Sequence, residues 1–165
     1  MHVSAERANK KLEEIILNIR LSSLDEAKQQ ILALWEMPEI KKEKGSVGFS
    51  PYQMLVHCAK TIEYSMTGYP SLKPALIRYV VGRPVIRRFL KQGYMNHDLA
   101  ADVPGSPAID DVGTFQDGIQ ELMDAIDRFT QYDADLKPHL LFGKLSKGAY
   151  DRYFAIHIAD HLSEL

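Results

Sequence analysis

Residues 112–132 read Val112-Gly-Thr-Phe-Gln-Asp-Gly-Ile-Gln-Glu-Leu-Met-Asp-Ala-Ile-Asp-Arg-Phe-Thr-Gln-Tyr132, and they decide the fold class. The large apolar residues of this stretch recur at intervals of four, three, four and three positions; they are Phe115, Ile119, Leu122, Ile126 and Phe129. On an α-helix all of these side chains lie along one face, with the spacing typical of helices that cross at shallow angles. The stretch therefore predicts one long helix of a helical bundle.

Start and stop signals divide the rest of the chain into further helices. Two capping boxes, Ser23-Leu-Asp-Glu26 and Ser50-Pro-Tyr-Gln53, predict helices over about 24–37 and 51–66. Ser146 can cap a last helix that reaches Leu165, and apolar spacing predicts another helix over residues 5–20. Strand patterns are weak throughout the chain.

These elements predict an all-α fold, a four-helix bundle that forms a single domain over residues 1–165. Residues 1–21 add an N-terminal helix. Residues 69–110 are rich in proline and glycine, so we expect them to form a long crossover between the second and third bundle helices. Short helices are expected within it, around 76–81 and 85–90. A connection of this length usually wraps the bundle or closes over a site.

Composition and charge exclude several classes of protein. The formal net charge of −2 gives no reason to expect binding to nucleic acid or to a membrane. One cysteine, Cys58, excludes an internal disulfide and fits a reducing compartment; its position predicts a core residue. Neither a signal peptide nor a transmembrane run is visible, so we expect a cytoplasmic protein.

Three histidines are the candidates for chemistry. His157 and His161 lie one turn apart on the last helix, so their imidazoles share one face, and His57 lies on another predicted helix. Each falls at the margin of an apolar arc, which predicts half-interior positions. Three histidines from two helices would form a site with open positions for zinc, nickel or ferrous iron. Further residues fall near them and are expected to line the cleft or to support the ligands: Gln53, Tyr64, Tyr150, Tyr153, Asp160 and Glu164.

A non-metal interpretation stays open for each of these residues. A single buried histidine usually forms a hydrogen bond with a carbonyl or carboxylate group. For the pair His157 and His161, one turn apart, a metal site and ordinary hydrogen bonding are about equally favoured. His97 and His139 fall on loops, where ordinary surface histidines are the favoured interpretation, although either could line the cleft.

Two stretches resemble a known superfamily. Ser50-Pro-Tyr-Gln-Met-Leu-Val-His57 resembles the Gln-x-Leu-x-His motif of the DinB-like (YfiT-like) proteins. Pro138-His-Leu-Leu-Phe-Gly-Lys-Leu-Ser146 and His157-Ile-Ala-Asp-His-Leu162 resemble the C-terminal half of an uncharacterised branch. The resemblance implies a four-helix bundle, frequent dimers and a divalent metal held by His57, His157 and His161. Related chains often carry a second histidine where this one has Asp160.

Several functions remain open on this basis. The resemblance implies a metal-dependent hydrolase or a transferase that uses a low-molecular-weight thiol, acting on a small-molecule substrate. In the thiol version, Arg83, Arg87 and Arg88 of the crossover could bind carboxylates of the cofactor. The rival interpretation is a non-catalytic, stress-associated or scaffold-like helical homodimer whose metal is structural or absent.

Overall fold

The computed structural model describes residues 19–35, 48–96 and 102–163, and within them the protein is all-helical. This confirms the predicted all-α class. The elements are α2 (Leu24–Trp35), α3 (Pro51–Thr67), α4 (Ala75–Ile77), the π-helical turn η1 (Arg78–Gly82), α5 (Arg83–Gln92), α6 (Phe115–Gln131) and α7 (Lys147–Leu162). No described helix has the length and apolar composition needed to cross a membrane.

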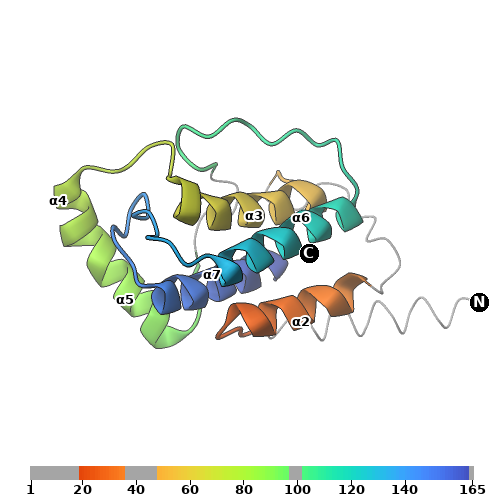
Figure 1. The fold of residues 1–165 in the computed structure, drawn as a ribbon, viewed down its shortest axis with the longest axis horizontal. Coiled ribbons are helices and arrows are strands. Elements are labelled where there is room, and N and C mark those ends of the chain that lie inside the picture. Colours follow the sequence, from red (N-terminus) through yellow and green to blue (C-terminus); the bar gives the residue numbers. More distant parts are fainter. Residues whose placement is uncertain (1–18, 36–47, 97–101, 164–165) are drawn as a thin grey trace, which may run out of the picture.

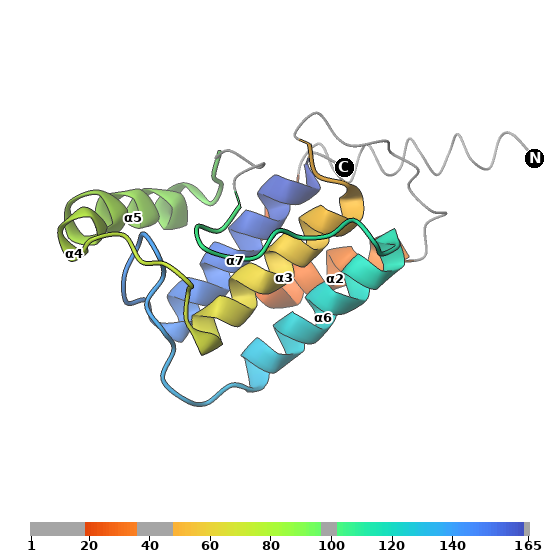
Figure 2. The ribbon, with the colours of Figure 1, turned by 90° about the horizontal axis from the view of Figure 1, so that it is seen from above.

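Four helices surround one core. Helix α3 packs most extensively on α6, helix α2 contacts both α6 and α7, and α7 contacts α3 (Figures 1 and 2). The apolar stripe of α6 is buried along its whole length, as its spacing predicts. This arrangement supports the expected four-helix bundle, with its long connection between α3 and α6.

The helix ends follow the capping signals, with one difference. Ser50 and Gln53 form the predicted capping box at the start of α3. At the start of α2 the hydroxyl of Ser23 accepts the amide of Glu26, but the Glu26 carboxylate accepts from Ser22 instead of Ser23. Helix α7 ends at Leu162, short of the predicted Leu165. The predicted N-terminal helix falls mostly outside the described residues, and 19–21 have no regular structure.

The crossover is more helical than its prolines suggest. Instead of two short helices, residues 75–92 form one uninterrupted helical run through α4, η1 and α5. Pro84 does not end it, because the wider turn of η1 directly before it leaves room for the proline ring. The run stands at one side of the bundle, where α5 packs on α7 (Figure 1). Residues 102–114 then pass back along α3 to α6 (Figure 2).

Candidate metal centre

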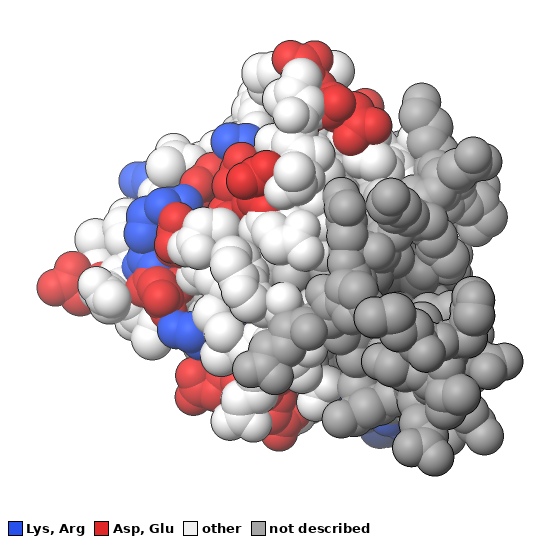
Figure 3. All heavy atoms as spheres, turned by 90° about the vertical axis from the view of Figure 1, so that its right-hand side faces the viewer, with Lys and Arg blue, Asp and Glu red and all other residues white. Residues whose placement is uncertain are grey.

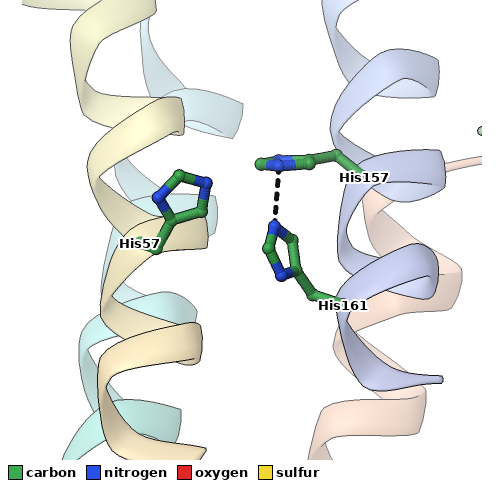
Figure 4. Close-up of side chains that lie close together, drawn as sticks. All are labelled: His57, His157 and His161. Carbon is green, nitrogen blue, oxygen red and sulfur yellow. Dashed lines mark hydrogen bonds between the residues drawn. The ribbon is translucent and has the colours of Figure 1, made fainter. Parts of the chain in front are cut away.

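The three predicted histidines come together between two neighbouring helices. His57 projects from α3 toward α7, where His157 and His161 lie on successive turns (Figure 4). One ring nitrogen of each lies within 4.8 Å of the other two. The ring centroids are 5.4 Å apart for His57 and His157, 4.9 Å for His57 and His161, and 4.6 Å for the α7 pair. The helical spacing of the α7 pair and the packing of α3 against α7 together produce one cluster.

The geometry of the α7 pair fits two ligands of one ion. The Nε2 atoms of His157 and His161 are 3.0 Å apart, the contact drawn dashed in Figure 4. Two nitrogens that each bind one ion at about 2.1 Å lie about 3.0–3.4 Å apart, for angles from a right angle to the tetrahedral one. Without an ion, one of the two nitrogens must carry a proton and donate it to the other. The ion-bound and the ion-free arrangements are therefore both compatible with a pair of neutral imidazoles.

All three rings are more deeply buried than predicted. The exposed fractions are 5 % for His57, 3 % for His157 and 1 % for His161, so the expected half-interior positions are wrong. Side chains from outside the two apolar arcs cover them: the ring of Phe49 lies 6.0 Å from that of His57, and Tyr153 stacks on His157 at 5.7 Å with an interplanar angle of 6°. The contact with Tyr153 is local, since residues 153 and 157 lie one turn apart on α7. Phe49 lies outside both helices, so a helical wheel does not show its contact with His57.

The other predicted site residues do not all lie at the histidine cluster. Tyr153 lies against the cluster. The buried Tyr150 ring carries its hydroxyl to the edge of the core, where it donates to the carbonyl of exposed Lys137 at 2.8 Å. The Gln53 amide donates to the carbonyl of Ile109 and its oxygen belongs to the α3 cap, so its polar atoms serve the fold.

Two more of these residues lie on the helices of the cluster. Half-buried Tyr64 lines a broad cavity of about 980 Å³ between α3, α6 and residues 102–112. Half-buried Asp160 helps to raise the pKa of the Cys58 thiol, although burial of the thiol is the larger cause. Cys58 is a core residue, as predicted, and it does not belong to the histidine cluster. Glu164 lies outside the described residues.

A smaller cavity of about 320 Å³ opens onto the cluster. His57 and His157 form part of its wall, beside Tyr153. The remaining lining comes mainly from α5, from residues 102–104 and from the 139–142 loop, and most of it is apolar: Val85, Phe89, Met95, Val103, Leu141 and Phe142. The crossover thus closes over the site, as its length suggests. Asp102 is the one acidic residue among the residues that line this cavity.

His139 lines the smaller cavity, which was the less favoured of its two interpretations from the sequence. Its ring is 4 % exposed and lines the smaller cavity, so the surface position favoured from the sequence is wrong. It stacks on Phe142, with centroids 4.2 Å apart, and burial lowers its pKa to about 3. The sequence feature that could have indicated this burial is Gly143, four positions after His139. Its φ of 74° closes a tight turn that folds Leu-Leu-Phe back over the imidazole ring. His97 lies outside the described residues.

The arginines proposed for a thiol cofactor do not face the cluster. Arg83, Arg87 and Arg88 are exposed on α5 and line neither of the two cavities. The charged lining of the broader cavity includes an ion pair between Arg128 and Glu63. At the end of the molecule opposite α4 and α5, acidic and basic side chains lie next to one another (Figure 3).

Fold and cluster together define a helical-bundle protein with a buried three-histidine centre. Residues 16–165 match the family described as a protein of unknown function (DUF1569), and the chain belongs to this family. No curated protein and no solved structure matches the chain.

Proposed function

We propose that this protein is a metal-binding member of the DinB-like superfamily, with His57, His157 and His161 as ligands of one divalent ion, and that it is a metal-dependent hydrolase of small molecules. The observation that carries the proposal is the convergence of three buried imidazoles from α3 and α7 beside a cavity. Imidazole nitrogen suits zinc, nickel and ferrous iron, so the donor set fits each of these ions.

The residues of the chain support hydrolysis in three ways. The helices fix the three ligands, since each ring lies on a regular, packed element. Apolar side chains of the crossover form much of the cavity wall beside the ligands, which lowers the local polarity around a bound substrate. Asp102 lies at the wall, where its exposed carboxylate can take up a proton. A bound ion supplies Lewis-acid chemistry, by which it polarises a substrate oxygen and activates water at neutral pH.

The alternatives receive less support from the structure. A thiol-dependent transferase needs a group that binds the carboxylates of the cofactor, and the arginines expected to do so face away from the site. A structural zinc site is usually closed by a fourth ligand, often cysteine. Cys58 is the only cysteine of the chain and it lies in the core, outside the histidine cluster. We therefore place the open, catalytic interpretation ahead of the scaffold interpretation.

The proposal extends to partners and location. We expect a small-molecule substrate, a homodimer and a cytoplasmic protein that binds neither nucleic acid nor membranes. The net charge of −2 and the intermixed charges of Figure 3 support the absence of a nucleic-acid surface on that face. Size-exclusion chromatography with light scattering would measure the oligomeric state.

Elemental analysis of the purified, tag-free protein tests the metal site. We expect one divalent ion per chain in the parent protein and none in the His157→Ala variant. The matched control is His139→Ala, which removes a buried imidazole outside the cluster and should keep the ion. Metal-dependent cleavage of p-nitrophenyl acetate, compared with conjugation of cysteine to monochlorobimane, then separates the hydrolase from the thiol transferase. A parent protein that binds no ion at stoichiometric level would refute the proposal.

A further inference from the structure

The tautomer of His139 follows from its partners. Its Nδ1 atom accepts the backbone amides of Leu141 and Phe142, both at 3.1 Å. Both partners are donors only, so Nδ1 carries no proton. A neutral imidazole with a bare Nδ1 must hold its proton on Nε2.

This tautomer sets the direction of the next hydrogen bond. The Nε2 atom of His139 lies 3.3 Å from the hydroxyl oxygen of Tyr153, so the imidazole donates and the hydroxyl oxygen accepts. The hydroxyl proton of Tyr153 is not used in this bond. Among residues 19–35, 48–96 and 102–163 no acceptor for that proton lies within hydrogen-bonding distance. Tyr153 is only 5 % exposed and lines the smaller cavity beside His157.

The other hydroxyl groups of this cavity are already engaged. The Thr61 hydroxyl donates to the His57 carbonyl at 2.9 Å, and the Tyr69 hydroxyl donates to the Thr61 carbonyl at 3.1 Å. Most of the remaining wall is apolar. Because a buried donor without an acceptor is costly, a ligand that supplies one oxygen at Tyr153 is favoured over one that supplies none.

We propose that the smaller cavity binds a small, mainly apolar molecule with one oxygen acceptor, such as an aromatic ketone or ester, and that Tyr153 donates a hydrogen bond to this oxygen. The volume of about 320 Å³ lies at the lower end of small-molecule sites and suits one aromatic ring with short substituents. The stack of Tyr153 on His157 places the bound oxygen beside the histidine cluster. The inference rests on the proposed function in one respect: this placement makes the bound molecule the substrate.

Two probes of similar shape test the proposal on the full-length protein after removal of metal with EDTA. Acetophenone has the carbonyl acceptor, and ethylbenzene replaces it with a methylene group. NMR titration should show that the parent protein binds acetophenone about twofold to tenfold more tightly, the gain expected from one net hydrogen bond. Tyr153→Phe should remove this preference and leave the affinity for ethylbenzene unchanged, which also shows that the variant is folded.

Two further variants locate the binding. Tyr79→Phe removes a hydroxyl from the exposed side of η1 and should bind both probes like the parent. Val85→Trp fills the cavity and should weaken both probes at least tenfold, with retained helical circular dichroism as the check on folding. Three results would overturn the proposal: no binding of either probe, equal affinity of the parent for both, or an unchanged preference in Tyr153→Phe. Metal plays no part in these titrations, so their failure is distinct from a failure to bind an ion.

Discussion

Burial of His139 as a neutral imidazole should make the protein less stable in mild acid. The folded state holds the pKa of this ring at about 3, because burial disfavours the charged form. In the unfolded chain the ring regains its ordinary pKa of about 6.5. Between these two values the unfolded state binds more protons than the folded state, so stability falls as the pH falls. Above about pH 7 both states are neutral and the effect vanishes.

The size of the effect follows from the two pKa values. Relative to pH 8, this single group should lower the free energy of unfolding by about 1.4 kcal/mol at pH 5.5 and by about 2.7 kcal/mol at pH 4.5. The matched variant is His139→Asn, because the asparagine oxygen can still accept the amides of Leu141 and Phe142 while the side chain does not titrate.

Urea denaturation at pH 8, 6.5, 5.5 and 4.5, with EDTA present, measures the difference between parent and variant. His139→Asn loses ring packing and should be less stable at pH 8, by an amount that does not depend on pH. The gap between the two proteins should then narrow by about 1.4 kcal/mol at pH 5.5. Carboxylates and the other histidines titrate in both proteins and cancel. Parallel curves across this range would show that His139 is protonated in the folded state and would refute the reasoning.

Four shorter predictions concern the metal and the packing. His157→Ala should abolish tight zinc binding by isothermal titration calorimetry, yet circular dichroism should show that both this variant and the EDTA-treated parent keep their helices. Zinc affinity should fall between pH 8 and pH 5, since imidazole must be neutral to bind the ion and protons compete for its nitrogen; equal affinity at both pH values would exclude histidine ligands. Gly82→Ala places a Cβ atom 1.9 Å from the Leu141 carbonyl oxygen and should cost about 1–3 kcal/mol in urea denaturation, or more. Leu122→Ala, at a fully buried position, should cost about 2–5 kcal/mol, and a loss below 1 kcal/mol would contradict its place in the core.

The features predicted from sequence are those set within single helices. The stripe from Phe115 to Phe129 is periodic, and its burial follows from that period alone. Ser50 and Gln53 form a capping box because the two side chains and the amides they meet are local. The pairing of His157 with His161 is also local, since it depends only on one helical turn. Their meeting with His57 depended in addition on the packing of α7 against α3.

The features that sequence patterns did not reveal depend on contacts between distant segments. The helical run through Pro84 packs closely against the 139–142 loop: the backbone of Gly82 contacts the carbonyl of Leu141, which is about sixty positions away in the chain. His139 is buried because Phe142 and Tyr153 close around it, one from its own loop and one from α7. A pattern of apolar spacing carries no information on either contact, because loops have no fixed period.

The bundle helices and the connecting segments contribute different parts of the site. Helices α3 and α7 supply the three imidazoles, and each helix is also held by core residues that do not touch the cluster. Much of the apolar cavity wall comes from α5, residues 102–104 and the 139–142 loop, which lie outside the four bundle helices and pack against their core. Changes in Val85, Phe89 or Val103 can therefore reshape the cavity without moving the histidines. A cluster held on packed helices beside a wall built from connecting segments is an arrangement in which the wall can vary while the cluster stays in place.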